Sequence, residues 1–298
     1  MNLDPFSRSV LQHDLVGPAR NVPARTYRIT DDAMTPEQGL QEGGVNGASR
    51  RLPPGVYTTF RTYGGNRVLC LGVHLDRLET SARLLGHNVS LDRSALRRAL
   101  ADVVSLGGFP ESRLRVTLAL PAGAIFATIA PFVPFAESMY RTGVHAVTRT
   151  MQRDRPKAKS TAFIAPSRHL KQTLPPTVFE VLMCLPNGEI LEGMTSSFFA
   201  VQDRVLHTAG QGVLEGITRR IVLDIAPRIL PVQLVPCRRA DLGAIAEAFI
   251  TSSSREVVPV VEIDGRLVGS GTPGPVTRRL LHRYRAFVRR VAEPLTHA

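Results

Sequence analysis

Cysteine is scarce in this chain of 298 residues, and lysine is equally scarce. The three cysteines, Cys70, Cys184 and Cys237, are odd in number and widely spaced, which argues against a disulfide framework and against a Cys-x-x-Cys metal pair. Their small number suits a reducing compartment, so we expect a cytoplasmic protein without a metal site. Only three of the 37 basic residues are lysines, and chemistry that needs an amine therefore has three candidates.

A hydrophobic run that could form a membrane-spanning helix is also lacking. Residues 116–136 carry no charge, but three prolines and a glycine interrupt them and would damage such a helix. The same residues read better as a strand, a turn and a second strand. The N-terminus contains Asp4 and Asp14 and no apolar core of a signal peptide. We therefore expect no membrane association.

Acidic residues are outnumbered, and the formal net charge is +12. A positive balance permits nucleic acids, anionic lipids or anionic small molecules as partners. Seven basic residues gather in 278–290, but the solvated face of an amphipathic helix has the same appearance, and no nucleic-acid-binding motif accompanies them. A basic nucleic-acid-binding protein without cofactor is thus a remote alternative, and nucleic acid is an unlikely partner.

The pattern of strands and helices predicts an α+β protein of two domains. Residues 1–133 would form a small domain whose first 50 or so residues are irregular. Residues 134–142, which lie in a stretch rich in Pro and Gly, would be the linker. Residues 143–298 would form a larger, β-rich domain.

Hydrophobic periodicity places the elements within these domains. Strands are expected in hairpins over 56–63 with 67–73, 178–193, 196–209 and 257–269, and singly over 246–253. Helices are expected over 74–86, 92–105, 217–229 and 275–291. Residues 269–274 match G-x-G-x-x-G, but only 24 residues follow, too few for the rest of a dinucleotide fold, so a turn before a helix is the better interpretation.

One region carries a more specific pattern. Residues 191–223 contain Glu192-Gly193, then Ser197-Phe198-Phe199, and later Leu-Glu-Gly-Ile-Thr-Arg. This order resembles the hallmark region of the class IV aminotransferases, the fold-type IV pyridoxal-phosphate enzymes. The family includes branched-chain and D-amino-acid aminotransferases, (R)-amine transaminases and aminodeoxychorismate lyase. Further matches lie in the same order at 74–86, Lys159-Ser160, 248–265 and 269–280. The resemblance implies the two-domain fold-type IV architecture.

The resemblance also implies roles for individual residues around pyridoxal 5'-phosphate. Lys159 would carry the cofactor and move the proton, and Glu192 would keep the pyridine nitrogen protonated so that the ring acts as an electron sink. The remaining cofactor-binding residues would be Arg77, Ser197, Gly216, Ile217, Thr218, Ser252 and Ser253. Ser197 stands where the family has an asparagine.

The implied substrate-binding residues are Tyr57, Arg61, Arg113 and Arg115. Arg113 and Arg115 alternate on one face of a strand, which favours an acidic or keto-acid substrate; pairing with acidic neighbours is the competing explanation. The resemblance implies a homodimer that transfers an amino group between an amino acid or amine and a 2-oxo acid, as branched-chain aminotransferases do. A pyridoxal-phosphate lyase of the aminodeoxychorismate lyase type is the alternative.

Overall fold

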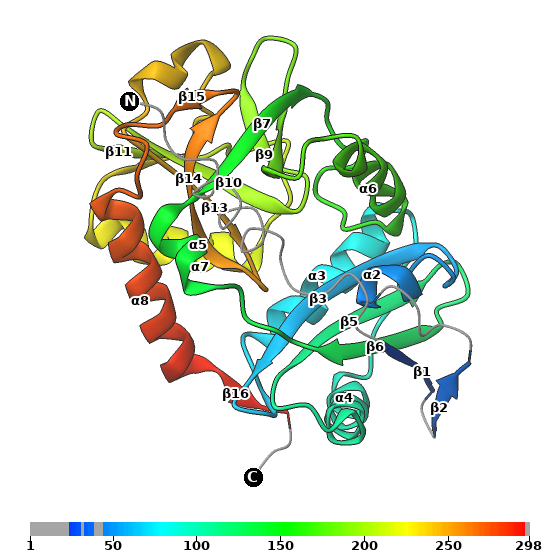
Figure 1. Cartoon of the computed structure of the whole chain (residues 1–298). Coiled ribbons are helices and arrows are strands. Elements are labelled where there is room, and N and C mark those ends of the chain that lie inside the picture. The colour runs from blue at the N-terminus through cyan, green and yellow to red at the C-terminus, as the bar shows by residue number, and fades with distance from the viewer. Residues whose placement is uncertain (1–23, 31–32, 39–43, 296–298) are drawn as a thin grey trace. The chain divides into compact units, whose positions relative to one another are not determined.

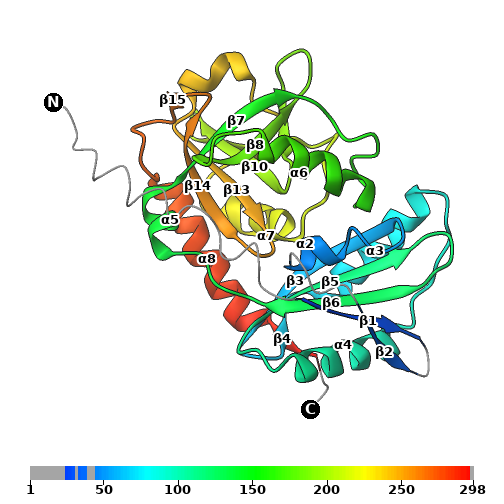
Figure 2. The same ribbon diagram turned by 45° about the vertical axis from the view of Figure 1, so that its right-hand side comes forward.

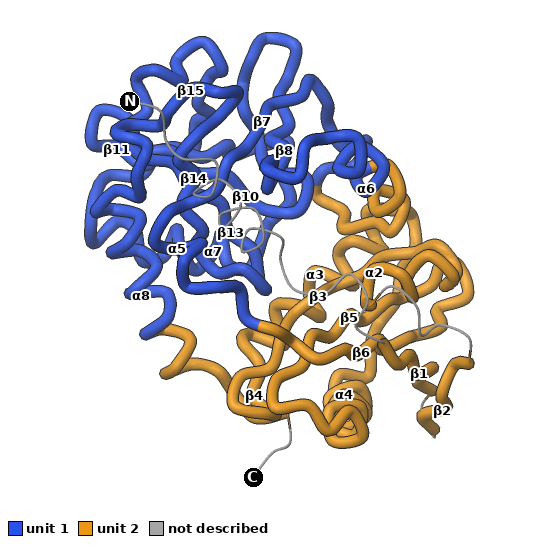
Figure 3. The backbone as a smooth tube through the Cα atoms, in the orientation of Figure 1, with its two compact units in different colours: residues 1–18, 134–156, 167–286 blue, residues 19–133, 157–166, 287–298 orange. Residues whose placement is uncertain are grey.

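The computed structural model describes residues 24–30, 33–38 and 44–295, and its contacts divide them into two compact units (Figure 3). Unit 1 comprises residues 134–156 and 167–286. Unit 2 comprises the described residues up to 133, together with 157–166 and 287–295. The units are therefore not continuous in the sequence. Each contains one sheet flanked by helices, which confirms the α+β class (Figure 1).

Unit 2 is built on a seven-stranded sheet of order β16-β4-β3-β5-β6-β1-β2, in which β5 and β6 are long neighbours (Figure 2). Its strands are β1 (Arg25–Ile29), β2 (Met34–Glu37), β3 (Gly55–Tyr63), β4 (Arg67–Val68), β5 (Ser112–Ala119), β6 (Ile125–Pro131) and β16 (Glu293–Pro294). The uncharged stretch 116–136 thus forms strands, as predicted. In the described part of the chain, no helix is long and apolar enough to cross a bilayer.

Alternation along β3 separates the two faces of this sheet. Val56 and Phe60 are buried on one face, in a core shared with helices α3 (Leu71–Leu84) and α4 (Arg93–Gly107). The short helix α2 (Gly44–Ala48) lies on the other face, where its Val45 packs with Ala24 and Ala130. Tyr57 and the odd-numbered residues of β3 belong to that second face.

Two expectations for this unit are wrong. The strand predicted over 67–73 stops at Val68, because Leu71 already begins α3. The apolar residues at 69–73 suit a strand and the first helical turn equally, so periodicity could not separate them. The first 50 residues were expected to be irregular, yet their described part contains β1, β2 and α2. β1 exists because β6 pairs with it over five residues, and that partner lies about 100 positions away.

Unit 1 contains a nine-stranded sheet. Its strands are β7 (Val144–Thr150), β8 (Val178–Cys184), β9 (Ile190–Gly193), β10 (Ser196–Gln202), β11 (Val205–His207), β12 (Val232–Gln233), β13 (Glu247–Ser252), β14 (Glu256–Ile263) and β15 (Arg266–Leu267). The order β10-β13-β14-β7-β8-β9, with β9 also paired to β10, closes six strands into a ring. Phe199 and Phe249 stack inside the sheet with ring centroids 4.8 Å apart.

The helices of this part are α5 (Glu137–Thr142), α6 (Ile164–Gln172), α7 (Ile217–Ile225) and α8 (Pro275–Val291). Short 3-10 turns cover Ala226–Arg228 and Arg239–Ala244 in unit 1 and Thr161–Phe163 in unit 2. The helix predicted over 275–291 is confirmed at both ends. Proline suits its first position, because the N–H that proline lacks would have no partner within the helix there. The predicted hairpins over 178–193, 196–209 and 257–269 are confirmed as well.

Candidate active site

Lys159, the predicted catalytic lysine, belongs to unit 2 and lies along the edge of β3. Its backbone N–H donates to Ser81 Oγ of α3 at 3.0 Å, and its carbonyl accepts from the Tyr57 N–H at 3.0 Å. Ser160 then forms an isolated antiparallel bridge with Val56. Lys157 is exposed, whereas Lys159 is half-buried. Helix α3 and strand β3 therefore determine where the Lys159 side chain begins.

The Tyr57 ring lies close to two cations. Lys159 Nζ is 4.9 Å from the ring centroid, and the guanidinium carbon of Arg115 is 4.5 Å from it. Such distances correspond to cation–π contacts, which are electrostatically favourable. Unit 2 thus brings together three of the predicted site residues around a single aromatic ring.

Arg115 is almost fully buried and is held by neutral acceptors. Its Nε donates to Thr59 Oγ1 at 3.1 Å, Nη1 to Ser49 Oγ at 2.6 Å and Nη2 to Asn46 Oδ1 at 2.7 Å. Burial lowers the pKa of Arg115, although a guanidinium stays protonated in proteins. The competing explanation for Arg115 was an ion pair with an acidic neighbour. Among the described residues, its hydrogen-bond acceptors are instead hydroxyl, amide and carbonyl oxygens.

Arg61 of β3 and Arg113 of β5 are opposite each other in the strand register, on the same face of the sheet as Tyr57. Arg61 Nη2 forms an ion pair with Glu111 Oε2 at 2.8 Å, and its guanidinium lies 4.0 Å from the Phe132 ring centroid. Arg113 is half-buried and stands beside it in the register. Like charges directly opposite each other are unfavourable, and Glu111 offsets that repulsion.

Arg77, the predicted phosphate-binding arginine, projects from the same helix as Ser81. Its Nη2 donates to Thr58 Oγ1 of β3 at 2.9 Å. Arg77 and Ser81 are four residues apart and so share one face of α3. The same helix face therefore holds the Arg77 guanidinium and, through Ser81, the backbone of Lys159.

Glu192 belongs to unit 1 and is buried on β9, with 2% of its surface exposed. Its Oε1 lies 3.1 Å from Arg153 Nε, and its Oε2 accepts from the Leu214 N–H at 3.2 Å. Arg219 is also buried nearby; burial lowers its pKa, and the charges of Glu215 and Glu192 offset only part of that lowering. A buried carboxylate among fixed positive charges is well suited to bind a protonated ring nitrogen.

Two glycines of the motif are required by close approach. Ser197 pairs with Glu192 in the register of β9 and β10. A Cβ on Gly216 would lie 2.8 Å from Ser197 Oγ, and one on Gly193 would lie 2.2 Å from Ser196 Oγ. A Cβ at either position would force the serine hydroxyl to move, so glycine lets the β9–β10 hairpin and the start of α7 come together without that shift.

The N-terminus of α7 has the chemistry of an anion site. Gly216 is its N-cap residue and makes no side-chain cap, so the first amides of the helix are not satisfied by a capping side chain. Thr218 Oγ1 and Thr251 Oγ1 are buried hydroxyls without a hydrogen-bond partner among the described residues. Helix amides and hydroxyl donors bind phosphate readily. These residues of unit 1 therefore fit the phosphate group of pyridoxal 5'-phosphate.

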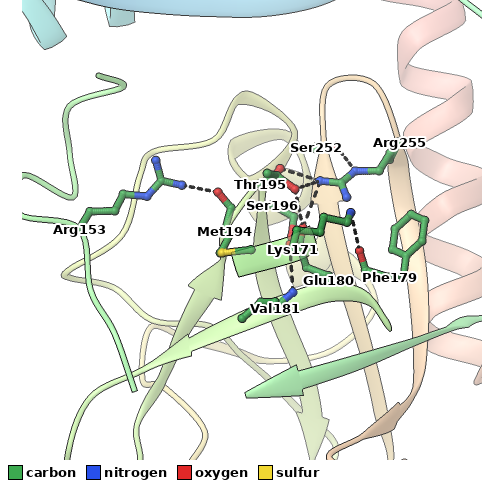
Figure 4. A network of polar contacts seen from close by, with 10 residues as sticks. All are labelled: Arg153, Lys171, Phe179, Glu180, Val181, Met194, Thr195, Ser196, Ser252 and Arg255. Carbon is green, nitrogen blue, oxygen red and sulfur yellow. Dashed lines mark hydrogen bonds and ion pairs between the residues drawn. The ribbon is translucent and has the colours of Figure 1, made fainter. Parts of the chain in front are cut away.

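Ser252 and Ser253 lie where β13 turns into β14, and a buried polar network supports this turn (Figure 4). Arg255 Nε donates to Ser252 Oγ at 3.0 Å, which leaves the Ser252 hydroxyl proton available to an acceptor. Arg255 Nη2 donates to the Thr195 carbonyl at 2.7 Å and forms an ion pair with Glu180 at 3.2 Å. The network thus connects the turn after β13 with the turn after β9.

Glu180, on β8, is the centre of this network. Its Oε2 accepts from the Thr195 hydroxyl at 2.7 Å and from the Ser196 hydroxyl at 2.8 Å. Burial by itself raises the pKa of Glu180, but the charges of Arg255 and Lys171, together with the hydrogen bonds from Thr195 and Ser196, outweigh burial and the net pKa is lowered. Glu180 is therefore an ionised group inside the unit.

Sequence reasoning missed Arg153, Glu180 and Arg255. Arg153 stands in the basic stretch RDRPKAK, where nothing distinguishes it from its neighbours. Glu180 is the one acidic residue in an otherwise apolar strand, and this contrast was the available signal. Arg255 is one of 34 arginines and carried no signal of its own.

Comparison with known proteins gives these residues a context. Residues 55–263 match the family model described as amino-transferase class IV. The chain belongs to the class IV aminotransferases. Members of this family are pyridoxal-phosphate-dependent transferases. The family match confirms the resemblance of the motif region and the assignment of the chain as an enzyme.

Individual relatives of this class IV aminotransferase are distant. The branched-chain-amino-acid aminotransferase of Pseudomonas aeruginosa is 27% identical over 254 residues, covering 77% of this chain and 82% of that protein. The D-alanine aminotransferase of Bacillus licheniformis is 28% identical over 241 residues, covering 76% and 84%. The crystal structure of the branched-chain aminotransferase from the archaeon Thermoproteus uzoniensis with norvaline matches with a TM-score of 0.73 at 26% identity, covering 91% and 99%. This last similarity confirms the fold-type IV architecture.

Proposed function

We propose that this enzyme binds pyridoxal 5'-phosphate and transfers an amino group from an amino acid to a 2-oxo acid, in the manner of a branched-chain aminotransferase. The observation that carries the proposal is the group formed by buried Glu192, Ser197 and the uncapped N-terminus of α7. It offers a carboxylate for a ring nitrogen and helix amides for a phosphate. The distant branched-chain aminotransferase relatives support the choice of substrate class.

Each chain segment has a role in this proposal. The cofactor supplies an electron sink for the negative charge that develops on the substrate's α-carbon. Glu192 holds a proton at the ring nitrogen, and the Lys159 amine moves the proton at the α-carbon. Arg77, the Ile217 and Thr218 amides, and the hydroxyls of the two serines at the β13–β14 turn would bind the phosphate oxygens. Ser252 and Ser253 are those serines.

The substrate would meet the odd-numbered face of β3. We assign the Tyr57 ring to substrate packing, and we assign Arg113, which is half-buried on the same face of the sheet, to binding of a substrate carboxylate. Arg115 already donates to Asn46, Ser49 and Thr59, so its part is to hold the Tyr57 ring. Arg61 is committed to Glu111 and supports this face. We propose also that the enzyme acts as a homodimer.

The test is an absorption spectrum of the protein with pyridoxal phosphate, before and after L-leucine, L-glutamate, D-alanine or (R)-1-phenylethylamine is added. The proposal expects a visible band that L-leucine or L-glutamate bleaches as the amino group is transferred. Bleaching by D-alanine alone would assign the opposite stereochemistry. A band that no donor bleaches would favour the lyase, and absence of any band would overturn the proposal.

A pair of lysine variants sharpens this test. Lys159→Ala should abolish the band and all turnover, because Lys159 is the lysine whose backbone α3 and β3 hold in place and whose Nζ lies 4.9 Å from the Tyr57 ring centroid. Lys157→Ala should retain both, since Lys157 is exposed two residues away. The reverse result would show that the catalytic amine has been assigned to the wrong lysine.

A further inference from the structure

A buried polar chain runs through unit 2 from α3 to β3 and back. His74 is 1% exposed and its Nδ1 lies 2.7 Å from Thr58 Oγ1. Thr58 is fully buried, and its Oγ1 accepts from Arg77 Nη2 at 2.9 Å. His74 and Arg77 are three residues apart on one face of α3, so a single hydroxyl of the neighbouring strand contacts both.

The number of protons available decides which group donates in each hydrogen bond between His74, Thr58 and Arg77. An arginine is always a donor, so Thr58 Oγ1 must accept from Arg77. The hydroxyl has one proton of its own, and among the described residues the one acceptor recorded for it is His74 Nδ1. Since a buried hydroxyl proton without an acceptor is costly, the proton points to Nδ1. His74 is then a neutral imidazole with its proton on Nε2.

The electrostatic surroundings agree with this protonation state. Burial, reinforced by the charges of Arg77 and Lys159, holds the pKa of His74 well below its ordinary value of 6.5. The Phe60 ring covers the imidazole with centroids 5.0 Å apart. An imidazolium here would add a third positive charge, and its Nδ1–H would leave the Thr58 hydroxyl proton without this acceptor.

We propose that Thr58 and His74 are positioning residues that orient the Arg77 guanidinium for the phosphate of the cofactor, an inference that rests on the proposed function. A long arginine side chain loses rotamer entropy when it binds an anion, and an acceptor that fixes one N–H reduces that loss. The acceptor is a hydroxyl backed by a neutral ring, so it orients the guanidinium without cancelling its charge. Thr58 therefore adds no negative charge that would compete with a phosphate for Arg77.

The experiment compares two ligands that differ only in the phosphate. Thr58→Val keeps the side-chain shape and removes the acceptor. We expect this variant to weaken pyridoxal phosphate binding about tenfold and to leave pyridoxal binding within about twofold of wild type, both followed by absorption titration. Thr58→Ser should restore the wild-type values. Should Thr58→Val not fold, His74→Phe, which keeps the ring against Phe60, carries the same expectation.

A matched control is Thr117→Val. Thr117 is a buried threonine of β5 in the same sheet whose hydroxyl has no hydrogen-bond partner among the described residues. It should alter neither affinity. Equal loss for both ligands in Thr58→Val would mean general damage and would overturn the inference, as would unchanged binding of pyridoxal phosphate. Wild-type protein that binds no pyridoxal phosphate would instead overturn the proposed function, and this inference with it.

Discussion

At the scale of single residues, the most informative feature is a carboxylate that is buried together with its cation. Glu192 and Arg153 have 3% and 6% of their side chains exposed, and their nearest polar atoms are 3.1 Å apart. Removing one member of a buried pair leaves the other charge uncompensated. Any substitution at Glu192 therefore combines a chemical effect with a structural one, and an experiment has to separate them.

Replacing Glu192 by glutamine keeps the side-chain shape, so that turnover reports the chemical effect and the cofactor band reports the structural one. The amide preserves the shape but cannot hold a proton at the ring nitrogen, so we expect pyridoxal phosphate to remain bound while kcat falls on the order of 10²- to 10⁴-fold. Turnover and the cofactor band are measured together. Glu189→Gln, on the same hairpin but partly exposed, is the control and should keep its rate. Normal turnover in Glu192→Gln would refute the assigned role.

His74 predicts how stability depends on pH. Its pKa is about 6.5 in the unfolded chain and well below that in the folded protein, so below pH 6.5 the unfolded chain binds a proton that the folded protein does not. Stability from this group is therefore complete above pH 6.5 and decreases as the pH falls below it. Thermal unfolding between pH 5 and 7.5 should show the decrease, and His74→Phe should reduce its slope. The exposed His282 provides the control, because His282→Gln should leave the slope unchanged.

At the scale of elements, the site depends on turns between strands. The turn after β9 carries Thr195, and the turn after β13 carries Ser252 and Arg255 (Figure 4). Strands β9 and β13 both pair with β10, yet their turns are joined through side chains, with Glu180 between them. Glu180, the one acidic residue of an apolar strand, thus connects the two turns.

A double-mutant cycle tests this connection. Glu180→Gln leaves Arg255 partly buried without its counter-charge, and we expect it to lower the free energy of unfolding by about 3–5 kcal/mol. Arg255→Met should also destabilise. The double variant should lose less than the sum of the two, because each residue's cost arises from the other. Strictly additive losses, measured by urea unfolding, would mean that the two groups do not interact.

Helix α4 allows a simpler prediction. The Asp92 carboxylate accepts from the Ala95 N–H at 2.9 Å and caps the helix. Asp92→Ala should cost about 1 kcal/mol of stability, the usual effect of losing an N-cap. Asp102→Ala removes an exposed aspartate from the middle of the same helix and should change stability by only a few tenths of a kcal/mol. Equal effects of the two would contradict the capping role.

At the scale of the whole molecule, two sheets are completed by chain segments from far apart in the sequence. Residues 157–166 return to unit 2 after β7 has formed part of unit 1, and α8 begins in unit 1 while its last residues belong to unit 2 (Figure 3). The sheet of unit 2 therefore contains residues from both ends of the described chain, since β16 near the C-terminal end pairs with β4.

The proposed homodimer is a prediction at this scale. Light scattering of the eluting protein should give about twice the chain mass of 32.5 kDa. Because the net charge is +12, the measurement is best made at about 0.15 M salt or above, where long-range repulsion is screened. A mass near 32.5 kDa that persists at millimolar pyridoxal phosphate would reject the dimer.

The sequence by itself determined what depends on local pattern. Hydrophobic period and turn residues located α8, the β8–β9 hairpin and the β5–β6 hairpin, because these signals lie within a few residues of the structure they specify. The order of short motifs was sufficient to predict the family, since it too is read along the chain.

The tertiary structure decided the strands, ion pairs and hydrogen bonds whose two partners lie far apart in the sequence. β1 became a strand through β6, the Arg153 guanidinium found Glu192 across 39 positions of sequence, and Thr58 became an acceptor because α3 packs on β3. None of these residues differs in type from many others in the chain. Their roles come from burial, which makes an unmet hydrogen bond or charge costly and so selects the one partner within reach.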